Sequence, residues 1–378
     1  MQITILGGGP AGLYFALLMK QQDPTHAVTV IERDGPDDTF GWGIVFSDQT
    51  FDYLRDSDAP SFERITAACE KWDNVDIVHR GQCVTVRGNR FSGIARITFL
   101  RVLQDRCREL GVDLQFHHPV NDLEQLPAHD LLVGADGANS LVRRTHEALF
   151  QPTVGQGRNK YIWLGTPRLF HGLTLSFVEH ATGLFTAHSY KFDRQTSTFI
   201  VECSEETWRA ASLDGKDEAE TCRFLEAVFA DHLQGEPLLA KNFLRWLNFP
   251  LVKNAHWHGK QVVLLGDALH TAHFSIGSGT KLALEDAIML ARAFAEETEP
   301  SRALPLFEAT RRPRVEQYQQ AALDSLRWFE DVGDHMHLAP LPFAVEAMTR
   351  SRRVDFEKLR QRDPEFVDAF ERWSRSHG

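Results

Sequence analysis

Blocks of apolar and polar positions at the start of the chain predict a βαβ unit. An apolar run at residues 2–6 stops at the glycine-rich segment 7–12, and an amphipathic pattern then continues over residues 13–22. A second apolar run at residues 27–31 ends at Glu32. A strand, a tight turn, a helix and a second strand in this order are typical of the first unit of a parallel sheet.

Apolar runs typical of strands and amphipathic patterns typical of helices occur again later in the chain. A helical pattern covers residues 98–110, and the apolar runs at 112–116 and 131–135 are typical of buried strands. A further apolar strand at 262–265 precedes a helical pattern at 281–297. These segments predict that the chain returns to its first sheet after each interruption.

Between residues 166 and 203 the pattern changes to short aromatic and β-branched runs separated by turns, which predicts antiparallel strands of a second, inserted region. The strands are expected at residues 173–178, 184–190 and 196–201. From residue 301 onward the pattern is helical and rich in Arg and Glu, and we expect Pro340 and Pro342 to break it.

Composition narrows the class of protein. With 378 residues, 43% of them apolar, the chain can bury a sizeable core around one ligand. No apolar run approaches the roughly 18 residues of a membrane helix, and the N-terminus lacks a secretory signal, so we expect a cytoplasmic protein without membrane contact. The net charge of -11 gives no reason to expect nucleic acid as a partner. Five cysteines without metal-ligand spacing predict neither a metal site nor a disulfide framework.

The glycine-rich turn predicts a dinucleotide site. Gly7, Gly9 and Gly12 fit the pattern G-x-G-x-x-G between a strand and a helix, where backbone N–H groups can face a pyrophosphate. Glu32 follows the second strand, where a carboxylate can accept hydrogen bonds from ribose hydroxyls, which favours FAD or NAD over NADP. A turn that merely packs helix on strand would not require that acid. The cofactor contacts expected here are Gly7, Gly9, Pro10, Ala11, Gly12, Glu32 and Arg33.

Two later segments resemble the group A flavoprotein monooxygenases. Residues 136–143, DGANSLVR, look like the D-G-x-x-S-x-x-R segment of that family, and residues 266–270, GDALH, look like its second FAD fingerprint. The resemblance implies that Asp136 lies near FAD and that Asp267 holds the ribityl chain. A carboxylate at a strand end before a helix suits a sugar hydroxyl. Asp136 could equally cap a helix.

The loop after the second fingerprint departs from the family, because residues 273–279 lack the usual proline. Its glycines remain, and they permit close backbone approach to a flavin ring and could stabilise negative charge on reduced flavin. For Trp42, core packing explains the residue equally well. The resemblance implies further FAD contacts from Trp42, Gly43, Arg96, Gly277, Ser278 and Gly279.

The resemblance also implies the fold, an α/β para-hydroxybenzoate hydroxylase-like architecture with a Rossmann-like FAD-binding domain. We expect this domain at residues 1–70, 95–155 and 255–330, an inserted antiparallel-sheet substrate domain at 71–94 and 156–254, and a C-terminal helical segment at 331–378. The expected oligomeric state is a monomer or a homodimer.

The activity that the resemblance implies is aromatic hydroxylation. NADH or NADPH would reduce FAD, O2 would form a C4a-hydroperoxyflavin, and an electron-rich ring carbon would receive its distal oxygen. Segments at 157–163, 188–191, 198–207 and 349–364 resemble salicylyl-CoA 5-hydroxylases and the monooxygenase half of 2-aminobenzoyl-CoA monooxygenase/reductases. Violacein-type tryptophan hydroxylases share some of them.

The substrate therefore stays open. It is either an aromatic acyl-CoA, such as salicylyl-CoA hydroxylated to gentisyl-CoA, or a free indole or phenol. A flavin reductase that does not oxygenate is the third alternative.

Candidate substrate residues are aromatic or cationic. Cations would be needed for the phosphates of a CoA thioester, although a solvated basic helix face is the alternative. The expected contacts are Tyr161, Trp163, Tyr190, Phe274, Arg158, Lys160, Arg350, Arg352 and Arg353. His188, His270 and His273 could handle protons or orient the substrate, but in a chain with 17 histidines any one of them is more often structural.

Overall fold

The computed structural model describes residues 1–240 and 245–377, so residues 241–244 and 378, which the expected domain ranges include, lie outside the described part. One sheet is fully parallel, with the strand order β15-β9-β1-β2-β8. Its strands are β1 (Gln2–Leu6), β2 (Ala27–Ile31), β8 (Asp113–Gln115), β9 (Leu131–Gly134) and β15 (Val262–Leu264). Each lies within an apolar run that the sequence predicted as a strand, which confirms this sheet.

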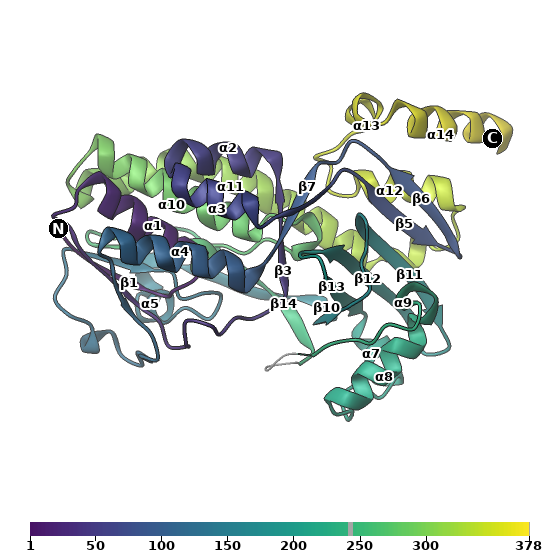
Figure 1. The fold of residues 1–378 in the computed structure, drawn as a ribbon, viewed down its shortest axis with the longest axis horizontal. Helices are drawn as coiled ribbons and strands as arrows, with labels where there is room; N and C mark the ends of the chain where they lie inside the picture. The colour runs from purple at the N-terminus through teal and green to yellow at the C-terminus, as the bar shows by residue number, and fades with distance from the viewer. Residues whose placement is uncertain (241–244, 378) are drawn as a thin grey trace.

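Long helices cover the parallel sheet in the left half of the molecule (Figure 1). They are α1 (Pro10–Gln22), α4 (Arg96–Leu110), α10 (Gly279–Glu296) and α11 (Pro300–Glu330), and α1 packs against both α4 and α10. Helix α1 is buried from Pro10 to Met19, because it is apolar on nearly every side. Gly9 at its N-terminus provides no side-chain cap, so the first turn keeps backbone N–H groups for a ligand.

A seven-stranded sheet forms the right half of the molecule, with the order β14-β10-β13-β12-β11-β5-β6 (Figure 1). Its strands are β5 (Val75–His79), β6 (Gln82–Val86), β10 (Pro152–Thr166), β11 (Leu173–His180), β12 (Gly183–Lys191), β13 (Ser197–Cys203) and β14 (Leu247–Asn254). The predicted antiparallel pairing holds for β11, β12 and β13. The pair β5–β11 is parallel, because β5 enters the sheet from another part of the chain.

Shorter elements complete the fold. A small sheet of β3 (Gly43–Ser47), β7 (Phe91–Ala95) and β4 (Glu70–Trp72) lies between the two large sheets, in the order β3-β7-β4 (Figure 1). The remaining helices before the C-terminal part are α2 (Asp48–Ser57), α3 (Ala59–Ala67), η1 (Leu123–Gln125), α5 (Leu141–Thr145), α6 (Glu147–Phe150), α7 (Glu205–Ala210), α8 (Glu218–Val228), α9 (Ala230–Leu233), η2 (Gly266–Ala268) and η3 (Phe274–Ile276).

The C-terminal part is helical, as predicted, but its prolines act differently from the expectation. Pro340 starts helix α12 (Pro340–Thr349), because a proline at the first helical position loses no hydrogen bond. Pro342 lies within the first turn of the same helix, so neither proline interrupts it. Helix α12 packs against β5 and β6. Around it lie η4 (Val332–His335), α13 (Phe356–Arg362) and α14 (Pro364–His377).

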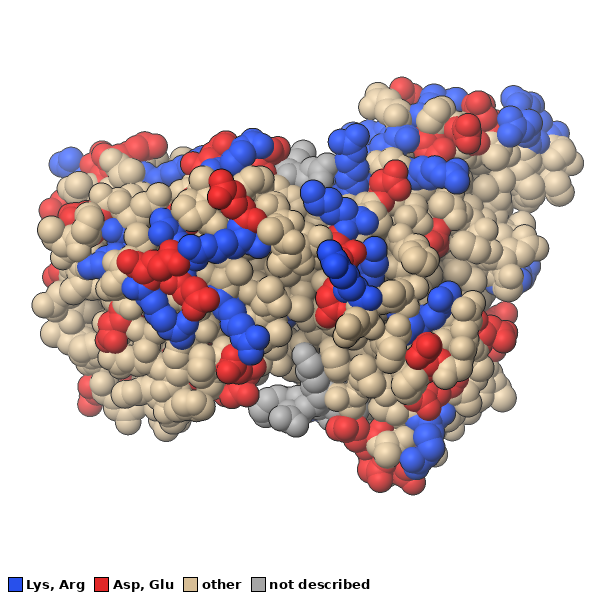
Figure 2. Space-filling view, viewed as in Figure 1, with Lys and Arg blue, Asp and Glu red and all other residues tan. Residues whose placement is uncertain are grey.

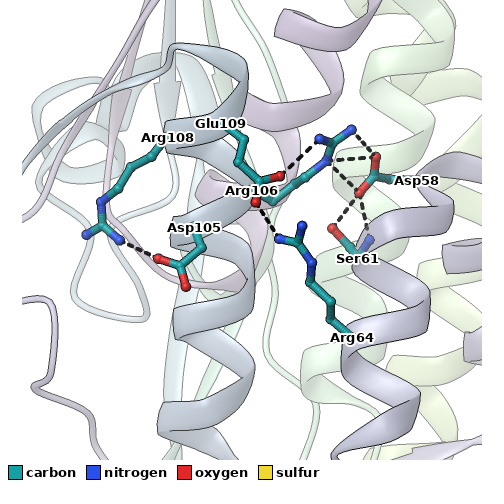
Figure 3. A network of polar contacts seen from close by, with 7 residues as sticks. All are labelled: Asp58, Ser61, Arg64, Asp105, Arg106, Arg108 and Glu109. Atoms are coloured by element: carbon teal, nitrogen blue, oxygen red, sulfur yellow. Dashed lines mark hydrogen bonds and ion pairs between the residues drawn. The ribbon is translucent and has the colours of Figure 1, made fainter.

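A network of ion pairs joins α3 to α4 (Figure 3). Asp58 caps α3 by accepting a hydrogen bond from the Ser61 backbone N–H at 3.0 Å. The Asp58 side chain is fully buried, and the Arg106 guanidinium approaches its two oxygens at 3.0 to 3.2 Å. Arg106 also contacts Glu109, which pairs with Arg64 at 2.7 Å. The network therefore fixes the spacing of the two helices around one buried carboxylate.

Replacing Arg106 by Met is expected to lower the free energy of unfolding by about 3 kcal/mol, because Asp58 would stay buried without its cation. The matched control is Arg108→Met, which removes an exposed pair with Asp105 and should cost less than about 1 kcal/mol. Urea denaturation of both variants measures the difference. Equal losses would contradict a special role for the Asp58 pair.

Candidate active site

A cavity of about 450 Å³ lies where the glycine turn, the second fingerprint, the small sheet and the C-terminal segment meet. Many of the expected residues line it. From the expected cofactor contacts these are Gly9, Pro10, Ala11, Gly43, Arg96, Asp267, Gly277, Ser278 and Gly279. From the expected substrate and catalytic residues they are Trp163, His188, Tyr190, Phe274, Arg350 and Arg353.

The three glycines of the first turn have different surroundings. A Cβ on Gly7 would come within 2.2 Å of the Ala135 carbonyl oxygen, and a Cβ on Gly12 within 2.1 Å of the Gly7 oxygen. Those two positions must be glycine because the backbones touch. A Cβ on Gly9 would meet nothing within 4 Å, and Gly9 faces the cavity. The turn therefore leaves open space for a ligand at Gly9, next to the free N–H groups of α1.

Glu32 does not line this cavity and contacts the backbone of the glycine turn instead. Its carboxylate accepts hydrogen bonds from the N–H groups of Gly8 at 2.6 Å and Asp34 at 3.0 Å. Arg33 is exposed and contacts Asp34 at 3.2 Å, so its side chain points to solvent instead of the cavity. In this structure the acid after the second strand thus holds the shape of the glycine turn.

The segment Asp136 to Arg143 joins two parts of the site. Asp136 accepts hydrogen bonds from the backbone N–H groups of Leu141 at 2.5 Å and Val142 at 3.3 Å, which are the contacts of a helix cap. Burial raises the pKa of the Asp136 carboxyl. Arg143 donates to the carbonyl oxygens of Ala268 at 2.8 Å and of Ala138. The arginine of this motif therefore ties it to the second fingerprint.

Asp267 and Arg96 bring opposite charges to the cavity wall. Burial raises the pKa of Asp267, while the nearby Arg96 opposes that shift. Arg96 begins α4 and donates from Nε to the Thr39 hydroxyl at 2.9 Å, and its backbone N–H donates to the Trp42 carbonyl at 2.9 Å. A carboxylate held here can accept sugar hydroxyls. Together with the open space at Gly9, the donor set fits FAD.

His270, the last residue of the second fingerprint, lies in a network of buried charges. It contacts Asp286 at 2.7 Å, and Asp286 pairs with Arg311 at 2.8 Å. Arg311 also pairs with Glu285 at 2.7 Å, and Glu285 accepts from Lys281. Burial alone would raise the pKa of Asp286, but His270 and Arg311 hold it below its usual value. Because His270 does not line the cavity, its geometry favours a structural role.

His188 and His273 lie on the substrate side. His188 lines the cavity and contacts the Glu202 carboxylate through Nε2 at 3.2 Å. His273 is buried outside the lining, with Nδ1 2.8 Å from the Ser275 hydroxyl. Burial lowers the pKa of His273 to about 4, although Glu202 opposes the shift, so its ring stays neutral near pH 7. Among the three predicted histidines, only His188 faces the cavity.

Trp42 and Trp163 each pack closely against a glycine, Trp42 against Gly165 and Trp163 against Gly41. A Cβ on Gly165 would come within 2.7 Å of the Trp42 ring, and a Cβ on Gly41 within 3.1 Å of the Trp163 ring. Trp163 lines the cavity, whereas Trp42 does not. Close packing accounts for Trp42, which was the alternative to a flavin contact.

The first residue of β3 is anchored to the seven-stranded sheet. The Gly43 N–H donates to the Thr198 hydroxyl at 3.0 Å, and the Tyr190 hydroxyl donates to the Gly43 carbonyl at 3.0 Å. Phe274 forms another wall of the cavity, and Tyr161 packs behind it with ring centroids 5.1 Å apart. The site thus has aromatic walls, with Tyr161 in support.

The predicted cations separate into two groups. Arg350 and Arg353 line the cavity, but the exposed side chain of Arg158 pairs with Glu330 and Asp331 at 2.9 and 2.6 Å. Lys160 donates to Asn248 at 2.6 Å, and Arg352 is 85% exposed with Asp324 at 3.9 Å. The structure places these three side chains outside the cavity.

Two cavity-lining cations were absent from the expected set. Lys281 and Arg362 both line the cavity. Arg362 lies in the tail segment 349–364 that carried the family resemblance, so the resemblance could have singled it out. Nothing in the sequence indicates that it lines the cavity.

Comparison with known proteins identifies the family. A family model described as an FAD binding domain matches residues 125–322, slightly more than half of the chain. Salicyloyl-CoA 5-hydroxylase of a Streptomyces species is 40% identical over all of this chain and 74% of its own length. The chain belongs to this family of FAD-dependent aromatic hydroxylases.

The hydroxylase is also similar to protodeoxyviolaceinate monooxygenase of Chromobacterium violaceum, at 37% identity over 94% of this chain and 95% of the relative. A solved 2-methyl-3-hydroxypyridine-5-carboxylic acid oxygenase has the same fold, with a TM-score of 0.72 at 20% identity over 93% of this chain and 98% of its own. The predicted fold class and family are therefore confirmed. As a member of this family, the hydroxylase uses FAD, NAD(P)H and O2.

Membrane contact was not expected. Within residues 1–240 and 245–377, no helix of the hydroxylase combines the length and the apolar character needed to cross a membrane.

Proposed function

We propose that the hydroxylase acts on the ring of an aromatic acyl thioester whose phosphate-bearing arm, such as CoA, lies along the cationic end of its cavity. The observation that carries the proposal is the charge of the lining. Among the described residues the lining includes the cations Arg96, Lys281, Arg350, Arg353 and Arg362, of which Lys281 is paired with Glu285, and the acid Asp267. The protein as a whole has a net charge of -11, so the charge of the cavity lining is opposite in sign to the charge of the whole protein.

The tail supplies the cations assigned to the arm. Arg353 is exposed, and its guanidinium lies 4.1 Å from the Tyr318 ring centroid. Arg362 is also exposed and donates to Asn89 at 3.0 Å. Neither belongs to the glycine turn or the second fingerprint, which suits a second anionic group besides the FAD pyrophosphate. The 40% identical relative is named for a CoA thioester, salicyloyl-CoA.

Basic side chains also gather on one face of the molecule. On the face drawn in Figure 2, a column of Lys and Arg runs along the junction of the two halves, below the C-terminal helices. Positive charge at such a junction favours the approach of an anionic substrate.

The chain's part in the reaction is to bind, orient and exclude water. Bound flavin supplies the activation of O2 with electrons from NAD(P)H. The Gly9 turn and the N-terminus of α1 would hold the pyrophosphate, Asp267 the ribityl chain, and Gly277 and Gly279 would approach the ring system. Trp163, Tyr190 and Phe274 would enclose the substrate ring and keep water away.

The direct test is a stoichiometric assay. We expect oxidation of NADH or NADPH with salicylyl-CoA or 2-aminobenzoyl-CoA to yield one oxygen atom in the aromatic product, which mass spectrometry detects as a hydroxylated thioester. Free salicylate should give little product. Turnover of tryptophan without any thioester would instead favour a free indole, the alternative supported by the 37% identical protodeoxyviolaceinate monooxygenase.

Replacing both Arg353 and Arg362 by Met is expected to raise KM for salicylyl-CoA about thirtyfold, because each of the two charged contacts to phosphate contributes roughly 1 kcal/mol. KM for the N-acetylcysteamine thioester, which has the same aromatic ring and carbonyl but no phosphate, should stay within about twofold. Arg158→Met, whose partners are Glu330 and Asp331, is the control. If KM rises equally for both thioesters, these arginines do not bind the phosphates.

A further inference from the structure

Two polar side chains that line the cavity, His188 and Arg350, pack against the ring of Phe329. The imidazole of His188 and the guanidinium of Arg350 both approach the ring of Phe329, at 4.6 and 5.1 Å from its centroid. Phe274 meets the His188 ring nearly perpendicularly, with centroids 5.2 Å apart. Both polar groups line the cavity. His188 and Arg350 therefore border the same cavity and contact the same aromatic ring.

Arg350 is a half-buried cation with donors to spare. It donates from Nε to the Ser325 hydroxyl at 2.9 Å, from a terminal nitrogen to the Ser275 carbonyl at 2.7 Å, and to Ala347. These contacts use three of the five guanidinium N–H groups, and the charge of Glu202 also acts on Arg350. The two remaining donors suit a carbonyl oxygen. Because the Ser275 carbonyl belongs to the loop after the second fingerprint, Arg350 also joins the substrate side to that loop.

Glu202 sets the tautomer of His188. The Glu202 carboxylate is 2% exposed and accepts from His188 Nε2 at 3.2 Å. Its other oxygen accepts from the Asn159 amide at 2.9 Å, which holds the carboxylate in place. Burial alone would raise the pKa of Glu202, but His188 and His273 hold it below its usual value, so it stays an acceptor. When Nε2–H donates to Glu202, Nδ1 of an uncharged imidazole is left to accept a hydrogen bond from a ligand.

We propose that Arg350 and His188, with Glu202 as the positioning residue, recognise an aryl carbonyl that carries a hydroxyl or amino group on the adjacent ring carbon. Arg350 donates to the carbonyl oxygen, and His188 Nδ1 accepts from the neighbouring O–H or N–H. The ligand's carbonyl acceptor would meet the donor Arg350, and its neighbouring O–H or N–H donor would meet the acceptor His188. Both protein groups contact the Phe329 ring. The inference rests on the proposed thioester function and assigns the residues that distinguish a ring with an ortho-hydroxyl or ortho-amino group from an unsubstituted ring.

The test is a binding panel on the FAD-loaded protein, read from the change in flavin absorbance. The ligands are benzoyl-CoA, 2-hydroxybenzoyl-CoA, 2-aminobenzoyl-CoA and 3-hydroxybenzoyl-CoA. We expect both ortho-substituted thioesters to bind about tenfold or more tightly than the other two, because they alone satisfy His188. This panel on the unaltered protein tests the inference even where a variant does not fold.

Two variants separate the roles. In Glu202→Gln the amide can turn its NH2 toward Nε2, so that Nδ1 carries the proton and no longer accepts. The ortho preference should then fall to about twofold or less while benzoyl-CoA binds as before, which a general structural defect would not produce. Arg350→Met should weaken all four ligands about tenfold. Arg352→Met, two residues away and outside the cavity, is the matched control and should change none of them.

The outcomes are distinct. Equal binding of all four thioesters by the unaltered protein would overturn the recognition of the ortho group and leave the thioester function standing. A protein that binds none of them but binds free acids or indoles would overturn the proposed function and this inference with it. Retention of the ortho preference in Glu202→Gln would remove Glu202 from the arrangement.

Discussion

Replacing Arg311 by Met is expected to lower the free energy of unfolding by about 4 kcal/mol. The Arg311 side chain is buried and pairs with both Glu285 and Asp286 at 2.7 and 2.8 Å. Without it, two carboxylates inside the protein lose their shared cation, although Lys281 and His270 remain beside them. Removal of one partner from a buried ion pair costs far more than the pair contributes, because the other partner stays desolvated.

The pH dependence of that loss has a definite sign. In the unaltered protein the pKa of Asp286 lies below its usual value, so its contribution to stability is complete above the pKa of an unfolded aspartate, about 3.9. The contribution is lost as the pH falls through the lower folded pKa. In Arg311→Met the burial of Asp286 is less compensated and its pKa rises, so the deficit should be largest near pH 7 and shrink toward pH 4.

Urea denaturation at pH 7 and pH 4.5 measures this deficit. Arg302→Met on the same helix is the control, because Arg302 is exposed and lies 3.7 Å from Glu297, and its loss should be about 0.5 kcal/mol or less. If Arg311→Met unfolds at the same urea concentration as this control, the buried network does not stabilise the second fingerprint.

Replacing Gly9 by Val is expected to weaken FAD binding about thirtyfold while the protein without cofactor remains as stable as before. The φ and ψ of Gly9, -79° and -178°, are open to any residue, and its added Cβ would meet no protein atom within 4 Å. The new side chain would occupy the space that the pyrophosphate needs. Overpacking of this kind costs about 2 kcal/mol, which corresponds to about thirtyfold in Kd.

Two further variants frame this result. Gly215→Ala also adds a Cβ into open space, but away from the cavity, and should change neither FAD binding nor stability. Gly12→Val should prevent folding of the turn itself, because its Cβ would lie 2.1 Å from the Gly7 oxygen. Fluorescence quenching of FAD gives Kd for each protein. An unchanged Kd in Gly9→Val would mean that the cofactor does not approach this turn.

The sequence predicted local elements well, because their signals are local. Strand β2 was expected at 27–31 and spans those residues, since four apolar residues and a β-branched threonine before an acid strongly favour a buried strand. The parallel pair β5–β11 was not foreseen, because residues about a hundred positions apart decide it. Buried acids were also missed: Glu202 lies in a strand that is buried throughout, and nothing in its neighbours indicates the His188 contact.

The tail shows most clearly where pattern reasoning stops. Arg350, Arg352 and Arg353 look equivalent in the sequence, yet Arg350 and Arg353 face the cavity while Arg352 faces solvent. The backbone of Arg352 is left-handed, with φ of 56°, which turns the chain between its neighbours. Such a reversal follows from the packing of the whole segment. Family resemblance could mark the tail as important but could not assign the direction of each side chain.

The contrast between a cationic cavity and an anionic exterior also affects how quickly ligands arrive. At long range an anionic molecule meets repulsion from the net charge of -11, and within a few ångströms of the opening it meets attraction instead. Salt at 0.1 M shortens the reach of both forces to about 10 Å. Capture of an anionic substrate should therefore follow the local potential at the opening more closely as ionic strength rises, and the overall acidity of the protein should become a poor guide to its kinetics.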